Sequence, residues 1–206
     1  MNSKNVISRI RIAVEPIYNC GKFYSGITIW AHALAVAQFA REFAVLYDAD
    51  EFVSEAAGLL HDVGAALYGR EDHHRTGVSE AGLILFEAGC ATEYMWPIFN
   101  AIYSHRGSIE KRLFLPSAVC VAAADAKDHF LNLGEVWLAQ ERRLATKDIS
   151  IIYPIVYAKV QKDWEKTSPE IRAMLNGSYE QAIDDLEGFL LGVKKPQVRQ
   201  QELVLV

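Results

Sequence analysis

Apolar residues recur along most of the chain at the spacing of amphipathic helices. Between residues 28 and 46 they fall at Ile29, Ala33, Val36, Ala40 and Phe43, so that one helix face is apolar. We find no period-two alternation long enough for a sheet, and therefore predict an all-α fold. The predicted helices cover residues 1–18, 28–46, 48–63, 76–88, 92–105, a run from 116 through 125, 135–144, 149–164, a short segment from 168, and 179–191.

Glycine, proline and capping residues set the expected helix ends. Gly64 follows an apolar run and predicts the C-cap of the helix over 48–63, and the polar residues 65–72 predict a loop. Gly134 separates two helices. Ser178 and Gln181 have capping-box spacing, which predicts the start of the last helix. We expect residues 1–193 to form one domain and residues 194–206 to form a tail.

Composition and charge exclude several classes of protein. The formal net charge is −5, which disfavours a nucleic-acid-binding surface and gives no reason to expect an anionic membrane as partner. No run of about 18 apolar residues occurs, and no signal-peptide core follows the N-terminal basic residues. Cys20, Cys90 and Cys120 have no paired spacing and are expected to be reduced thiols. These features predict a cytoplasmic protein.

Ionisable residues interrupt three of the apolar runs. His32 lies in one run, the pair His61-Asp62 ends another, and Asp125 closes the run Ala118–Asp125. A carboxylate on an apolar helix face must be neutralised by a cation, a metal or hydrogen bonds. Imidazole and carboxylate ligands without thiolates suit Mn, Fe, Co, Ni or Zn in an open catalytic site, rather than a closed structural zinc site.

The order H…HD…D resembles that of the HD superfamily of metal-dependent phosphohydrolases, which have an all-helical fold. The resemblance covers about residues 25–135 and implies an HD-like helical bundle, with additional C-terminal helices over residues 135–193. It also implies a metal site formed by His32, His61, Asp62 and Asp125.

Some HD proteins hold a second metal, and this chain has residues at the corresponding positions. His73, with His74 as the alternative, precedes Gly77, and His105 ends the next predicted helix. Asp62 would then bridge two ions. The resemblance thus implies one or two divalent transition-metal ions.

The likeness is greatest to small bacterial HD hydrolases that act on nucleotides, including those that cleave diadenosine tetraphosphate. It implies that a metal-activated water attacks a small phosphorylated substrate such as a nucleotide, with Asp62 at the metals and Asp128 orienting water. No Gly-Tyr-Pro triplet of the cyclic-di-GMP phosphodiesterases is present. Positive charge for the substrate is expected from residues close to the ligands in sequence, namely Arg70, Arg75, Arg106, Lys111 and Lys127.

Two other functions are compatible with the sequence. One is a non-enzymatic ligand-binding or regulatory protein on the HD scaffold, although such a protein has no reason to keep four ionisable groups on apolar faces. The other is a hydrolase of the alarmone (p)ppGpp. His129 is expected to be structural or exposed, and the sequence leaves the oligomeric state open.

Overall fold

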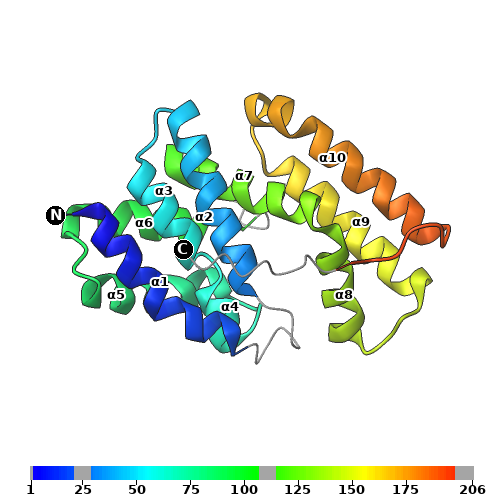
Figure 1. Cartoon of the computed structure of the whole chain (residues 1–206), viewed down its shortest axis with the longest axis horizontal. Helices are drawn as coiled ribbons and strands as arrows, with labels where there is room; N and C mark the ends of the chain where they lie inside the picture. The colour runs from blue at the N-terminus through cyan, green and yellow to red at the C-terminus, as the bar shows by residue number, and fades with distance from the viewer. Residues whose placement is uncertain (1, 21–28, 107–114, 198–206) are drawn as a thin grey trace.

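The chain folds into packed helices, as the hydrophobic pattern predicts. The computed structural model describes residues 2–20, 29–106 and 115–197, and these residues contain no strand, which confirms the all-α class. In Figure 1, α7 runs through the middle of the molecule, between α1 to α6 and α8 to α10. The helices are α1 (Ser3–Asn19), α2 (Ile29–Leu46), α3 (Glu51–Leu60), α4 (Val63–Tyr68), α5 (His73–Glu87), α6 (Thr92–Ser104), α7 (Pro116–Leu131), α8 (Leu133–Leu144), α9 (Ile149–Glu165) and α10 (Pro169–Leu190).

Small residues let α2 and α3 approach closely at the centre of the core. Ala33, Ala37 and Ala40 of α2 are fully buried. A Cβ atom on Gly58 of α3 would lie 2.6 Å from the Cα atom of Ala37, so only glycine fits there. This close packing brings the C-terminal end of α3, and the histidine that follows it, against the first turns of α2.

Gly64 does not cap a helix, and this prediction was wrong. The helix over 48–63 ends at Leu60, and a new short helix, α4, begins at Val63, where we expected a loop over 65–72. A Cβ atom on Gly64 would lie 2.4 Å from the backbone nitrogen of Gly77 and 2.5 Å from the carbonyl oxygen of His73. Glycine is required because two helix backbones touch here, and the contact fixes α5 against the His61-Asp62 turn.

We expect Gly64→Ala to destabilise the protein by about 2 kcal/mol or more, because the added methyl group must push α4 and α5 apart. Urea unfolding measures the loss, and Gly177→Ala is the matched control. Gly177 also lies within a helix, but nothing lies within 4 Å of its Cβ position. Equal effects at the two positions would contradict the close α4–α5 contact.

The C-terminal region contains one long helix where two were predicted. The buried residues Ile171, Leu175, Ala182 and Leu186 of α10 continue one apolar stripe across residues 177 and 178. Ser178 lies inside this helix, and the N-cap is Ser168, which accepts a hydrogen bond from the amide of Ile171. Packing of a continuous stripe outweighs the local capping signal.

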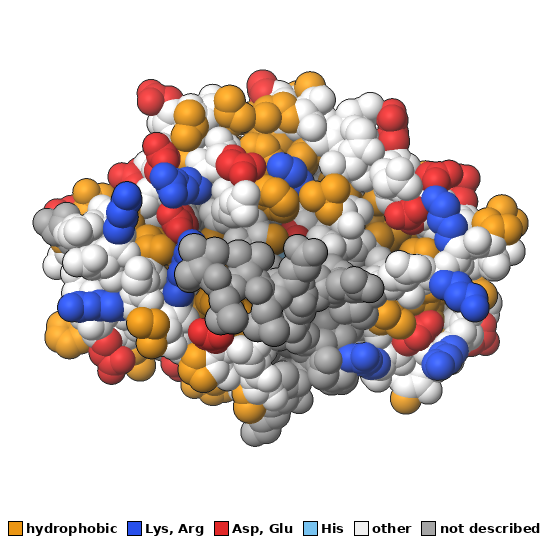
Figure 2. Space-filling model, in the orientation of Figure 1, with side chains coloured by type: hydrophobic (Ala, Val, Ile, Leu, Met, Phe, Trp, Pro, Cys, Tyr) orange, Lys and Arg blue, Asp and Glu red, His pale blue; other side chains and the backbone are white. Residues whose placement is uncertain are grey.

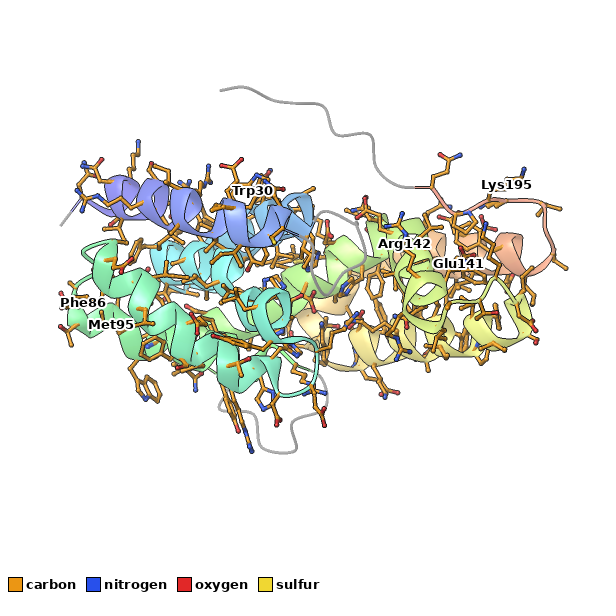
Figure 3. All side chains as sticks on the ribbon, turned by 90° about the horizontal axis from the view of Figure 1, so that it is seen from below. Trp30, Phe86, Met95, Glu141, Arg142 and Lys195 are labelled. Carbon is orange, nitrogen blue, oxygen red and sulfur yellow. The ribbon has the colours of Figure 1, made fainter. Side chains whose placement is uncertain are left out.

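The two ends of the molecule are built from different parts of the chain. Phe86 of α5 and Met95 of α6 lie at one end, whereas Glu141 and Arg142 of α8 lie towards the other, on the side of Lys195 (Figure 3).

Gly134 lies in the first turn of α8, which starts almost directly after α7. Within the described residues, no helix has the length and apolar character needed to cross a membrane.

Candidate metal centre

The candidate ligands come from separate helices and converge at one place. The His61-Asp62 turn carries two of them, because α3 ends one residue before His61 and α4 starts one residue after Asp62. The others arrive from helices that pack around this turn. His32 lies in α2, His73 starts α5, His105 directly follows α6, and Asp125 lies in α7.

One cluster consists of His32, His61, Asp62 and Asp125. The Nε2 atoms of His32 and His61 lie 3.1 Å apart, and Oδ1 of Asp125 lies 3.4 Å and 3.9 Å from them, respectively. Oδ2 of Asp62 lies 3.8 Å from Nε2 of His61. His61 has no exposed surface, and Asp125 is 5% exposed. These four residues are those that the H…HD…D order selects.

A second cluster shares Asp62 with the first. The Nε2 atoms of His73 and His105 lie 3.2 Å apart. Oδ1 of Asp62 lies 3.5 Å from Nε2 of His73 and 3.8 Å from that of His105. The two oxygens of one carboxylate therefore face two different histidine pairs, which is the arrangement that a ligand bridging two ions requires.

Hydrogen bonds at Nδ1 determine which nitrogen each histidine offers to the centre. The Nδ1 atoms of His61, His73 and His105 lie 2.8, 2.9 and 2.5 Å from backbone carbonyl oxygens three residues earlier. A carbonyl only accepts, so these Nδ1 atoms carry the proton and Nε2 presents a lone pair. Facing Nε2 lone pairs are unfavourable without a cation between or beside them. The donor set therefore fits divalent metal ions.

The acid–base properties of two imidazoles agree with metal ligation. Burial lowers the pKa of His61, and burial together with neighbouring His61 and His73 lowers the pKa of His105 to about 3. Both rings are therefore neutral near pH 7, as a metal ligand must be. Burial would raise the pKa of Asp62, but the surrounding histidines outweigh it and hold the pKa below its usual value.

Asp128 contacts one of the candidate ligands directly. Its Oδ2 lies 2.7 Å from Nδ1 of His32, its Oδ1 accepts a hydrogen bond of 3.0 Å from Asn132, and it is 2% exposed. It therefore orients His32 as a positioning residue, and its predicted part in orienting water stays a prediction. Burial lowers the pKa of His32, but hydrogen bonds to Asp125 and Asp128 outweigh it and raise the pKa to about 10, so this ring is protonated in the metal-free protein and would bind an ion only by releasing its Nε2 proton.

The structure separates His73 from His74, which the sequence left as alternatives. His74 is also buried, but its Nδ1 lies 3.4 Å from a guanidinium nitrogen of Arg106, and its ring packs edge-on against Tyr103. Among the described residues, no set of side chains that lie close enough together to share one metal ion includes His74. His73 is in such a group with Asp62 and His105.

Sequence reasoning missed the contribution of α9. Lys166 pairs with Asp125 and lies 3.0 Å from Asp163. Asp163 also accepts a hydrogen bond of 2.6 Å from Lys159 and lies 3.0 Å from Nδ1 of His129. His129 thus belongs to a largely buried ionic network, in which it contacts both Asp125 and Asp163. The available signal was Asp163, a carboxylate that continues the buried stripe of α9.

Of the five cationic residues predicted to bind substrate, two lie at the centre. Arg70 and Arg106 line a pocket that also contains Asp62, His73 and His105. Arg75 is exposed and lines neither pocket that contains Asp62. Lys127 lies over the Phe39 ring and 3.8 Å from Glu42, against α2, and is also absent from both pockets. Lys111 is outside the described residues.

The shared position of Asp62 predicts the number of ions. We expect about two divalent ions per chain in the wild type and about one in His105→Ala, because this change removes a ligand of the second cluster only. Elemental analysis of protein purified without chelator measures both. A stoichiometry of one in fully active wild-type protein would contradict a two-ion centre.

Comparisons with known proteins agree with this geometry. The model of the family described as "HD domain" matches residues 29–129. Ribonuclease Y of a Nitratiruptor species is 39% identical over 93 residues, which are 44% of this chain and 16% of that protein. Ribonuclease Y of Latilactobacillus sakei is 38% identical over 104 residues, 49% of this chain and 18% of that protein. The matches thus span less than a fifth of these ribonucleases.

A solved structure resembles the whole chain. The crystal structure of Bacillus subtilis YpgQ superposes with a TM-score of 0.71 and 18% sequence identity, and the superposition covers 96% of this chain and all of that one. At this identity the likeness shows the fold alone. The family match, together with the ligand order, identifies residues 29–129 of this chain as an HD domain.

Proposed function

We propose that this protein is a metal-dependent phosphohydrolase that acts on a small phosphorylated molecule, with a nucleotide as the best fit. The observation that carries the proposal is the shared carboxylate of Asp62, which faces both histidine pairs. HD domains are generally metal-dependent hydrolases. Divalent ions bound here would lower the pKa of water and neutralise charge on the phosphoryl oxygens.

The residues of the chain itself perform the rest of the task. Asp128 holds Nδ1 of His32, and backbone carbonyls hold the other imidazoles, so the ligand atoms are oriented before the ions bind. Arg70 and Arg106 line the pocket and can bind phosphate oxygens. Little covalent chemistry is required of the protein in such a reaction, which depends on positioning and charge.

A second pocket adjoins the metal centre and offers room for the organic part of a substrate. The two pockets share Asp62, Arg70, His129 and Lys159. Apolar and hydrogen-bonding side chains both line the second one, as a planar base with polar edges requires. Its other lining residues include Ile29, Asn132, Glu135, Val136, Ala139 and Gln140.

The test is a hydrolysis assay that depends on metal. Protein purified without chelator is analysed for metal and then assayed on an aryl phosphate, nucleoside mono-, di- and triphosphates, diadenosine tetraphosphate and (p)ppGpp. We expect hydrolysis of at least one nucleotide, its loss with chelator and its recovery on adding Mn²⁺ or Co²⁺. Hydrolysis that resists chelator, or metal-loaded protein that hydrolyses none of these compounds, would contradict the proposal.

A second candidate is hydrolysis of RNA, because the matched relatives are ribonucleases with 38–40% identity in the aligned part. The net charge of −5 disfavours a polyanion that must lie along the surface. On the face shown in Figure 2, basic and acidic side chains are interspersed. A short RNA in the same assay separates the two candidates, since cleavage of RNA with no nucleotide hydrolysis would favour the ribonuclease.

A further inference from the structure

One wall of the metal pocket is formed by α9 and the residue that follows it, which lie outside the HD domain. Lys159, Lys162 and Lys166 of this region line the pocket together with Asp163. Their spacing of three and four residues places them on one face. This face lies against Asp125 and His129 of α7. The chain thus adds a row of lysines to the centre from a helix that the family match does not include.

The three lysines differ in what they already contact. Lys166 is almost fully buried and pairs with Asp125 and Asp163, and Lys159 contacts Asp163 and His129. Lys162 is exposed and forms no ion pair within the described part of the chain. Lys159 and Lys166 therefore stabilise the packing of α9 through their ion pairs, while Lys162 is able to bind an anionic ligand.

Arg106 lines the same pocket from the C-terminal end of α6. Its guanidinium lies 3.4 Å from the neutral ring of His74, and it pairs with no carboxylate of the described residues. Lys162 of α9 and Arg106, two residues after the end of α6, thus present positive charge to one space.

The pocket carries more positive charge than its acidic residues can neutralise. Five cationic side chains line it, Arg70, Arg106, Lys159, Lys162 and Lys166, against the three carboxylates of Asp62, Asp125 and Asp163. The whole chain has a net charge of −5, so this excess is local. Divalent ions at the histidine clusters would increase it further. A single phosphodiester carries one negative charge, whereas a chain of phosphates carries several.

We propose that Lys162 of α9 and Arg106, which follows α6, form a subsite for the second and further phosphates of an oligophosphate. The substrate class is then an organic di- or triphosphate rather than a monoester or an RNA diester. This inference rests on the proposed function, because it places the first phosphate at the metal centre. Lys162 and Arg106 supply the contacts that distinguish a phosphate chain from a lone phosphate.

The test measures binding, so that it does not depend on turnover. Isothermal titration calorimetry on metal-loaded protein, with Mn²⁺ in excess of the probe, gives Kd for orthophosphate and for tripolyphosphate. We expect tripolyphosphate to bind at least about tenfold more tightly in the wild type. Lys162→Ala and Arg106→Ala should each weaken the binding of tripolyphosphate about tenfold and the binding of orthophosphate less than about twofold.

Lys147→Ala is the matched control. Lys147 is also an exposed lysine, but it precedes α9 at the other end, roughly 20 Å away at 1.5 Å per helical residue. It should leave both constants unchanged. If the variants lose equal affinity for the two probes, or if Lys162→Ala loses none, the subsite is refuted even if hydrolysis is found. If no hydrolysis is found but the variants lose affinity for tripolyphosphate alone, the subsite stands and the proposed reaction is rejected.

Discussion

Asp62→Ala protein is expected to bind neither ion and to lose the proposed hydrolytic activity by at least about a thousandfold. Oδ2 of Asp62 faces His61, and Oδ1 faces His73 and His105, so one substitution removes a ligand from both clusters. Loss of the ions removes several kcal/mol of charge stabilisation, and each 1.4 kcal/mol is about a factor of ten in rate. Elemental analysis and the hydrolysis assay measure the two effects.

The fold should survive the same substitution. Asp62 lies in the turn between α3 and α4 and forms no part of the apolar core. Circular dichroism should therefore show nearly unchanged helical content. His61→Ala should behave similarly, whereas His74→Ala should keep both ions, because His74 contacts Arg106 and Tyr103 instead of the clusters. Retention of metal in both Asp62→Ala and His61→Ala would refute the metal centre.

Lys166→Met is expected to destabilise the metal-free protein by about 3–5 kcal/mol. Burial lowers the pKa of Lys166, but Asp125 and Asp163 outweigh it and raise the pKa above its ordinary value. Burial would raise the pKa of Asp163, but Lys159, Lys166 and His129 outweigh it and hold the pKa low. Lys166 and its two carboxylate partners are therefore charged near pH 7, and removing the lysine leaves two buried carboxylates without their common cation.

Urea unfolding in the presence of chelator measures this loss. The double variant Lys166→Met with Asp163→Leu should recover part of the stability, because it removes a carboxylate together with the cation. Saturating metal should also reduce the loss, because an ion at Asp125 replaces the missing positive charge. A loss below about 1 kcal/mol in chelator would show that α9 does not stabilise Asp125.

The helices themselves follow from the hydrophobic pattern, with failures where packing overrides local signals. The stripe of α2 is predicted correctly because its buried positions repeat every three or four residues. Gly64 looks like a helix end in the sequence, but its function is to let α4 and α5 touch. Ser178 looks like a cap, yet the apolar stripe of α10 passes through it without a break.

The ligand order along the chain is enough to identify His32, His61, Asp62 and Asp125 as candidates. Helical periodicity also places them on apolar faces, where a charge needs a partner. It does not identify that partner, because periodicity tells which face of a helix is buried but not which helix packs against it. His73 and His74 are adjacent in sequence and point to different neighbours, so only the packing of α5 against the His61-Asp62 turn distinguishes them.

By itself the sequence determined the all-α class, the HD signature and the four residues that carry it. The tertiary structure decided the contact of Asp128 with His32, the place of His73 and the participation of α9. These depend on contacts between residues far apart in the chain, such as His32 with Asp128 and Lys166 with Asp125. Local propensity acts over a few residues, whereas charge neutralisation in a buried site depends on whichever helix the core packing brings alongside.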